Sequence, residues 1–468
     1  MNARDLSVWS EHAPGAYAAQ PSRGGRPQDR AHQPSYAPTE EPRKARPILL
    51  LGFVELALHH GALGIARSAG RLGVDVYDAH PGRRTRGCLS RYCRRGVRLP
   101  PDKNTEDTLA RLRAFTEEHG PSVLVAVDDA SAMFIGDHAD ALADASFLFP
   151  RQPEGLARTL ASKRAMHELC REHAIPTPLS MFPSSEEEVL SCAEQMTFPV
   201  VAKRIDGSQP ARAQQSGAGN RAEGAAVRER PPSVLIAANP RELLTAYEAM
   251  ESPLEPNVML QEYVPGRPDT IWMFNGYFDA DSECKVGFTG RKLRQSPPYT
   301  GMTTLGVCVT NATVEQHTKR LAKALGYRGI LDIGYRFDAR DGQYKLLDVN
   351  PRIGTTFRLF VDASGMDVLR AMYFDFTGRP VPEAHTQDGR RWLVEPRDLR
   401  SSLVYLRRGD ITLGEWARSF RHVQETAWLS WKDPRPAVKM LALLLLDRLR
   451  RAAARGAARG PARVQADE

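Results

Sequence analysis

Short apolar runs alternate with amphipathic stretches between residues 46 and 150. Apolar runs cover residues 48–54, 74–77 and 123–127, and the stretches 55–72 and 109–119 repeat apolar side chains at helical spacing. Buried parallel strands are apolar on both faces, and helices connect one strand to the next. We therefore expect a doubly wound α/β domain over residues 46–150.

This domain lacks the glycine fingerprint of dinucleotide sites. The loop after the first strand contains only Gly52, and no GxGxxG occurs. The alternative interpretation, a dinucleotide-dependent oxidoreductase, is therefore supported by the strand–helix alternation alone. Asp128 and Asp129 follow the third apolar run, where open α/β sheets place ligands. They are equally suited to capping the next helix.

Strands are more frequent from residue 151 to 380. We expect strands at 198–203, 234–237, 258–264, 270–278, 285–293, 330–337 and 345–349, and helices at 162–173, 240–250 and 313–325. Residues 206–232 are rich in Gly, Ala, Gln, Arg and Ser without periodicity, which predicts a mobile loop. We expect residues 1–45 to form a disordered leader. Residues 381–468 read as helical pieces between polar loops.

Composition narrows the class of protein. The chain has 468 residues, 42% of them hydrophobic and 26% charged, which indicates a globular protein of about two to four domains. Its net charge of +8 is concentrated in arginines at 83–98 and 448–463. Neither cluster has interleaved aromatic residues or a nucleic-acid-binding motif, so we expect solvated faces and no nucleic-acid partner.

Cysteine usage and apolar segments indicate a cytoplasmic protein. The 6 cysteines are scattered without zinc-ligand spacing, and no signal-peptide run occurs at the N-terminus. Residues 438–446 are the most apolar stretch, but they are too few to span a bilayer. We therefore expect no integral membrane segment. A docked terminal helix is the favoured interpretation of this stretch, and a basic amphipathic helix lying on a membrane is the alternative.

The residues with the clearest chemistry lie at 346–352. Asp348 and Asn350 fall on one face of a short strand, because side chains alternate along strands. Pro351 ends that strand, and Arg352 follows. Carboxylate and amide oxygens suit Mg²⁺ that bridges phosphates, and an arginine can grip a phosphate or a carboxylate. The alternative is a hairpin strand with an incidental turn at the proline.

Cationic side chains precede this strand along the chain. Lys163 lies in the first turn of a helix, and Lys203 ends an apolar strand. A lysine at a buried strand end needs an anionic partner or a route to solvent. Strand alternation places Lys292 and Arg294 on one face, with Arg291 behind them.

Together these features resemble the ATP-grasp superfamily, and within it the carboxylate–amine ligases. The most specific part of the resemblance is the phrase from Gly326 to Arg352, which contains Asp-Val-Asn-Pro-Arg. The resemblance runs from about residue 46 to 380 and implies an ATP-grasp fold after the N-terminal domain. The implied parts are a small lid domain at 151–257, a larger antiparallel-sheet catalytic domain at 258–380, and a helical extension at 381–468.

The resemblance also implies roles for individual residues. Lys163 and Lys203 would bind ATP phosphates, Glu262, Tyr263 and Val264 the adenine, and Asp269 the ribose. Arg294, Lys292 and Arg352 would stabilise the transferred phosphoryl group. Asp348 and Asn350 would hold Mg or Mn.

Two features depart from the family pattern. Gly334 stands where the family commonly has another acidic metal ligand, and Asp332 is the candidate substitute, because Asp338 reads as a turn residue. The loop at 206–232 is longer than the family's glycine-rich lid loop, although Gly217 and Gly219 could approach phosphates.

The expected function is ATP-dependent joining of a carboxylate to an amine through an acyl phosphate. The alternative is an ATP-binding protein of the same fold with a regulatory or scaffolding role, which Gly334 and the long loop favour. The substrates are small molecules, with amino acids among the candidates. Neither substrate is identified by the sequence, and a homodimer is among the open oligomeric states.

Overall fold

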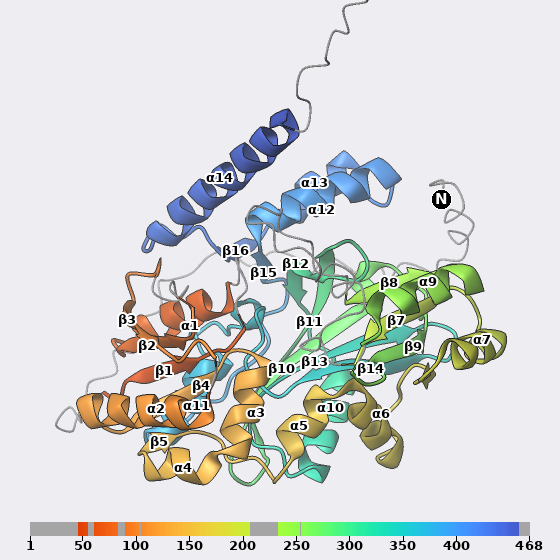
Figure 1. Cartoon of the computed structure of the whole chain (residues 1–468). Helices are drawn as coiled ribbons and strands as arrows, with labels where there is room; N and C mark the ends of the chain where they lie inside the picture. Colours follow the sequence, from red (N-terminus) through yellow and green to blue (C-terminus); the bar gives the residue numbers. More distant parts are fainter. Residues whose placement is uncertain are drawn as a thin grey trace, which may run out of the picture.

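A computed structural model describes residues 45–54, 60–82, 89–102, 104–205, 233–252 and 254–457 of the chain (Figure 1). The leader expected at the N-terminus, the arginines at 83–86 and the loop at 206–232, with Gly217 and Gly219, lie outside the described residues. Three sheets organise the rest of the chain.

The first sheet is parallel and five-stranded, with the order β3-β2-β1-β4-β5. Its strands are β1 (Ile48–Leu51), β2 (Val76–His80), β3 (Cys93–Arg98), β4 (Ser122–Ala126) and β5 (Phe147–Leu148). Ile48 and Leu50 pack with α1 (Gly61–Gly70) on one face. Leu49 and Leu51 pack on the other face with α2 (Thr105–His119), α3 (Asp129–Asp137) and α4 (Ala139–Asp144). The expected doubly wound domain is confirmed.

Sequence reasoning missed β3, which pairs with β2 at the edge of this sheet. Arg94 and Arg95 are exposed on β3 and pair with Asp75 and Glu118. An edge strand needs little apolar surface and often carries charges, so this strand has no apolar run to reveal it.

The second sheet is small and antiparallel, with the order β6-β9-β7-β8. It contains β6 (Ser180–Met181), β7 (Val200–Arg204), β8 (Val234–Ala237) and β9 (Val258–Glu262). Helices α7 (Glu186–Gln195) and α9 (Pro240–Met250) share its hydrophobic core. The expected boundary at residue 257 separates β9 from its partner β7, so the small sheet extends to Glu262.

The third sheet has seven strands in the order β14-β13-β10-β11-β12-β15-β16. Its antiparallel part comprises β10 (Ile271–Phe278), β11 (Cys284–Ser296), β12 (Met302–Cys308), β13 (Gly329–Asp338) and β14 (Gln343–Asn350). One core joins β10, β13 and β14 to α5 (Leu156–Ala161), α6 (Lys163–Glu172) and α10 (Ala312–Ala324). A second core includes α1 and α11 (Val368–Phe376), so it joins the large sheet to the N-terminal domain.

The C-terminal region is not purely helical, contrary to the expectation. Strands β15 (Arg391–Leu393) and β16 (Val423–Thr426) extend the large sheet, because β15 pairs with β12. Helices α12 (Glu395–Arg408), α13 (Leu413–Ser419) and α14 (Arg435–Ala457) lie along the upper edge of the molecule in Figure 1. The sequence did not reveal β15 and β16, because strands this short show no detectable alternation of apolar and polar side chains. Among the helices that the structure describes, none combines the length and the apolar character that a bilayer span requires.

A buried arginine fastens the C-terminal region to the N-terminal domain. Arg67 of α1 donates from Nε to Asp433 Oδ2 at 3.0 Å, and its other nitrogens donate to the carbonyls of Ala427 and Trp428. Asp433 is fully buried and also accepts from Ser90 Oγ at 2.7 Å. The contact therefore satisfies both charges inside the protein.

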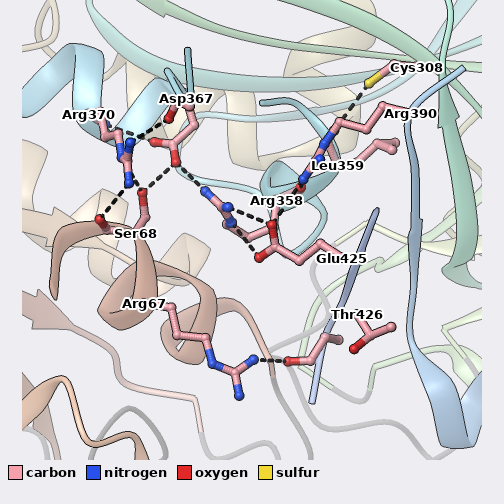
Figure 2. Close-up of polar contacts among 12 residues, drawn as sticks. Arg67, Ser68, Cys308, Arg358, Leu359, Asp367, Arg370, Arg390, Glu425 and Thr426 are labelled. Carbon is pink, nitrogen blue, oxygen red and sulfur yellow. Dashed lines mark hydrogen bonds and ion pairs between the residues drawn. The ribbon is translucent and has the colours of Figure 1, made fainter. Parts of the chain in front are cut away.

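A second cluster, drawn in Figure 2, joins the same regions. Arg358 donates to Glu425 and to Asp367, and Asp367 also accepts from Ser68 Oγ at 2.5 Å. Arg390 contributes a further bond to Glu425 at 3.0 Å. Burial raises the pKa of Glu425, but the Arg358 guanidinium overcomes this and holds it below its usual value.

We predict that Arg67→Met lowers the free energy of unfolding by about 3–5 kcal/mol, because it leaves the Asp433 carboxylate buried without its charge partner. Urea unfolding of the full chain measures the change. Arg94→Met is the matched control, because it breaks an arginine–aspartate pair that is exposed. Equal losses in the two variants would contradict a special role for the buried pair.

Candidate active site

The pairing of β13 with β14 brings the three expected metal ligands to one part of the large sheet. Asp332 lies opposite Asn350, and Gly334 lies opposite Asp348. Asn350 Nδ2 donates to Asp332 Oδ2 at 3.2 Å. Asp348 is exposed, and Asp332 is half-buried. The strand register therefore groups two carboxylates and one amide.

Asp332 is surrounded by cationic side chains and by a close approach of the backbone at Gly354. Burial raises the pKa of Asp332 to about 6, against the opposing charges of Arg352 and Lys292. A Cβ at Gly354 would lie 2.4 Å from Asp332 Oδ2, so a glycine is needed there. Asn275 is fully buried on the neighbouring strand opposite Asp332, and its side chain acts to lower the pKa of that carboxyl.

Arg352 connects this group to the N-terminal domain. Its Nε donates to Asp129 Oδ1 at 2.7 Å, and another nitrogen donates to Asn350 Oδ1 at 3.1 Å. Burial lowers the pKa of Arg352, but Asp129 more than compensates and raises it. Asp128, in contrast, caps α3 and accepts from the backbone N–H groups of Phe53 and Val54. Of the two aspartates, Asp129 alone belongs to the site.

The small sheet faces these residues with a lysine. Lys203 of β7 donates to Gln261 Oε1 at 2.5 Å. Burial lowers the pKa of Lys203 to about 8, while Asp348 acts to raise it, and Lys163 and Lys292 lower it further. The charges of Asp348, Lys163 and Lys292 all act on Lys203, which places the four side chains in one neighbourhood. The candidate site therefore lies between the small and large sheets.

Lys163 and Lys292 complete the cationic side of the site. Lys163 starts α6, and its Nζ lies 3.4 Å from the carbonyl oxygen of Ile205. Burial lowers the pKa of Lys292, and the carboxylates of Asp332 and Asp348 oppose that change. An anion placed between these lysines would compensate their mutual repulsion.

Arg294 does not lie beside Lys292 in the candidate site, so the expectation that the two side chains share one face of the strand was wrong. A β-bulge interrupts β11 between the two residues, and a bulge changes which side of a strand the following side chain faces. Arg294 is buried and makes two 2.8 Å bonds to the Asp398 carboxylate and one 2.7 Å bond to Ser419 Oγ. Arg291 lies over the ring of Trp272. Lys292 is therefore the β11 cation that faces the carboxylates.

The residues expected to bind the nucleoside lie at the end of β9, but Glu262 is already paired. Its carboxylate lies 2.6 Å from Arg340 and 3.7 Å from Lys345, and both cations also contact Asp338. The Arg340 guanidinium is the main reason that the pKa of Asp338 is well below its usual value. Asp338 also accepts from the backbone of Arg340, which fits the expected turn residue.

Tyr263, Val264 and Asp269 lie in the segment that follows. Tyr263 lies under the guanidinium of Arg336, with 5.6 Å between the guanidinium carbon and the ring centroid. Val264 is buried, and Asp269 is half-buried in the 3-10 turn Pro268–Thr270.

Two residues of the site were not singled out from the sequence. Arg336 lies two positions beyond Gly334 and four beyond Asp332 on β13. Strand alternation could therefore have placed it on the same face of the sheet as those two residues. Asn275 is the sole strongly polar side chain in the otherwise apolar or aromatic strand Ile271–Phe278. An unexplained polar residue in a buried strand was the available signal.

Within the described ranges, no group of three or more His, Cys, Asp or Glu side chains could hold a metal ion. The candidate set instead has two carboxylates and one amide. Mg²⁺ commonly takes one or two carboxylates and completes its coordination with phosphates and water. The residues present therefore fit a magnesium–nucleotide complex better than a metal held by protein alone.

Comparisons with known proteins identify the fold. No protein-family model matches the chain. It is 22% identical over 306 residues to a D-aspartate ligase of Enterococcus faecium (strain Aus0004), an alignment that covers 63% of this chain and 69% of the relative.

Solved structures with the same architecture include two enzymes. The L-amino acid ligase of Bacillus licheniformis superposes with a TM-score of 0.51 at 14% identity, covering 71% of this chain and 74% of that one. The second is the biotin carboxylase domain of the Hydrogenobacter thermophilus 2-oxoglutarate carboxylase, in complex with MgADP, ADP and bicarbonate. It superposes with a TM-score of 0.53 at 14% identity, covering 74% of this chain and 73% of that one. The chain has the ATP-grasp fold that the resemblance predicted.

We predict that nucleotide affinity decreases as the pH rises through about 8, where Lys203 loses its proton in the free protein. A bound phosphate would favour the charged amine, so affinity should fall by up to about tenfold per pH unit until the pKa of the complex is reached. Calorimetric titration with ADP between about pH 7 and pH 9 measures this.

Lys203→Arg should remove that pH dependence, because a guanidinium stays charged over this range. Lys285→Arg is the control, since Lys285 lies at the exposed start of β11 and should leave the profile unchanged. An unchanged slope in Lys203→Arg would show that Lys203 does not contact the phosphates.

We also predict that Gly334→Asp strengthens divalent-cation binding. A Cβ at Gly334 meets no atom within 4 Å, and the position faces Asp348 across the strand pair. A third carboxylate should lower the Kd for Mn²⁺ about tenfold, equivalent to about 1.4 kcal/mol. Electron paramagnetic resonance of free Mn²⁺ measures that Kd.

Gly414→Asp provides the matched control, because a Cβ there also meets nothing within 4 Å and the residue lies on α13. Unaltered Mn²⁺ affinity in Gly334→Asp would mean that the metal is not held opposite Gly334.

Proposed function

We propose that this chain is an ATP-dependent ligase that joins a carboxylate to an amine through an acyl phosphate. The observation that carries the proposal is the meeting of Lys203 from the small sheet with Lys292, Asp348 and Asp332 from the large sheet. Cations opposite carboxylates, in a site formed by two sheets, suit a magnesium–triphosphate complex. The ligase relative and the solved ligase structure support the same reaction class.

The triphosphate would lie between the lysines and the carboxylates. Lys163 and Lys203 approach from the small-sheet side and would bind the phosphates. Asp348, Asn350 and Asp332 would hold magnesium, which when bound supplies positive charge at the phosphate oxygens. Manganese would satisfy the same oxygen ligands.

Lys292 and Arg352 would act where the substrate carboxylate meets the γ-phosphate. The carboxylate oxygen attacks phosphorus, the bond to the bridging oxygen breaks, and ADP leaves with that electron pair. Two anions approach in this step, so fixed cations lower its barrier. Lys292 faces Asp332 and Asp348, and Arg352 is held by Asp129 and Asn350. Arg294 is excluded from this role by its pairing with Asp398.

The amine then attacks the acyl phosphate carbon, an amide forms, and inorganic phosphate leaves. The amine loses a proton in this step, and the departing phosphate can accept it. Water would hydrolyse the acyl phosphate, so the reaction requires that water be kept from this intermediate.

The nucleoside would bind at the end of β9. Because Arg340 and Lys345 hold the Glu262 carboxylate, we assign adenine recognition to the backbone of Glu262 and Val264 and to the Tyr263 ring rather than to the free carboxylate. Asp269 is the candidate for the ribose hydroxyls.

Amino acids are the substrate class that the comparisons favour. The relative is named for D-aspartate and one structural neighbour for L-amino acids. At these low identities the side chain and the configuration of the substrate do not transfer. A cytoplasmic location and a homodimer remain predictions from the sequence.

The alternative is a nucleotide-binding protein without ligase activity. Gly334 favours this alternative, because it removes a carboxylate from the position opposite Asp348. The half-buried Asp332 beside Asn350 compensates for that loss, so we retain the ligase proposal.

We predict magnesium-dependent formation of ADP and phosphate when the chain is supplied with ATP and a pool of amino acids. Asp348→Ala should reduce kcat/KM by at least about 100-fold, because the charge at the transferred phosphoryl group is no longer neutralised. Asp348 is exposed, so the variant should keep its fold and its melting temperature.

Asp281→Ala is the control, since Asp281 is an exposed aspartate in the turn between β10 and β11. Full activity of Asp348→Ala would refute the metal assignment. Tight binding of ATP without turnover on any amino acid pair would support the regulatory alternative.

A further inference from the structure

The C-terminal region carries an unusual share of exposed apolar surface. Of the 15 large hydrophobic side chains that are exposed in the described part of the chain, 10 lie between Leu399 and Leu446. Trp431 is fully exposed, and Val438, Leu441 and Leu445 of α14 are 52–64% exposed. Single exposed leucines are ordinary, but a concentration of them marks an interaction surface.

These side chains are not the face by which α14 attaches to the protein. Ala437 and Met440 are buried, and Leu444 packs against the main core. At helical spacing, residues 437, 440 and 444 form one stripe, and Val438, Leu441 and Leu445 form another about 100° further round. The helix thus has a docked apolar stripe and a second, exposed one.

The base of α14 is firmly held. Asp433, two residues before the helix, is the buried partner of Arg67. From there α14 runs along the periphery, and its C-terminal end points away from the sheets (Figure 1). The exposed stripe is therefore presented in a fixed orientation.

Charge surrounds this apolar surface, and its sign is positive. Between residues 399 and 446, eight basic side chains are exposed, whereas Asp410 and Glu415 are the sole exposed acidic ones. Arg435, Lys439 and Lys432 lie on α14 or in the turn before it, and Arg400 and Arg407 lie on α12. We call this combination, from Leu399 to Leu446, the C-terminal apolar–basic surface.

We propose that the C-terminal apolar–basic surface binds peripherally to a membrane containing anionic lipids. Leucine and tryptophan side chains would enter the headgroup boundary while lysine and arginine remain at the phosphates. A second copy of the chain would bring the same positive charges face to face, which opposes self-association through this surface. The membrane supplies both the apolar phase and the opposite charge.

This binding would leave the candidate active site open. The surface lies on α12 and α14 along the upper edge of the molecule, whereas the strands β13 and β14 lie below them, nearer the middle of the view (Figure 1). The proposal is independent of the reaction catalysed, because no residue of the surface belongs to the site.

Co-sedimentation of the full chain with vesicles tests the proposal. Vesicles of phosphatidylcholine mixed with phosphatidylglycerol should bind the chain, and pure phosphatidylcholine should bind it at least about tenfold more weakly, since the electrostatic part of the attraction is lost. Added salt should weaken the binding for the same reason.

The double variant Leu441→Gln/Leu445→Gln should lower partitioning at least about tenfold, since two apolar side chains no longer enter the lipid. Leu190→Gln is the matched control and should bind like the parent, because Leu190 is an exposed leucine of α7, the helix that packs on the small sheet. Trp431→Ser is a second test at a position with no packing to lose.

Loss of binding in the double variant and in Trp431→Ser, with retained binding in Leu190→Gln, would support the proposal. Three results would overturn it: no binding to anionic vesicles, binding unchanged in both variants, or dimerisation through these leucines measured by light scattering without vesicle binding.

Discussion

The balance of charge between β13, β14 and the small sheet is the constraint on which the site depends. Lys203, Lys292 and Arg352 are all withdrawn from bulk water, and burial alone would favour their neutral forms. Asp348, Asp332 and Asp129 supply the opposing charge. The carboxylates thus favour the charged forms of the cations, against the effect of burial. The site is thus assembled by the same electrostatics that would receive a nucleotide.

This balance of charge requires that three separate parts of the chain keep fixed positions relative to one another. The N-terminal domain contributes Asp129, the small sheet Lys203, and the large sheet the remaining groups. The buried pair Arg67–Asp433 and the cluster around Arg358 fix the N-terminal domain to the C-terminal strands. Burying ions costs free energy unless every charge is paired, so such contacts are specific in geometry. The C-terminal region therefore has a structural role at the domain junction, although it lacks identifiable site residues.

Much of this organisation was available from the sequence, because it follows from local patterns. The strand at Asp348 and Asn350, the apolar runs of the N-terminal sheet and the lysine at the end of β7 needed only alternation and burial to be recognised. Arg294 could not be placed, because its orientation depends on a bulge set by pairing with β12. The edge strand β3 and the short strands β15 and β16 likewise form through tertiary pairing rather than intrinsic preference.

The carboxylate of Glu262, in the segment that the resemblance assigns to the adenine, is committed to contacts within the protein. Its carboxylate closes an ion network with Arg340, Lys345 and Asp338 at the β13–β14 hairpin. That network connects the last residue of the small sheet to the large sheet, so releasing the carboxylate to bind a base would leave two cations underpaired. The backbone groups beyond it have no such cost. We therefore expect any recognition of a base at this segment to use the main chain, while the side chain of Glu262 joins the small sheet to the β13–β14 hairpin.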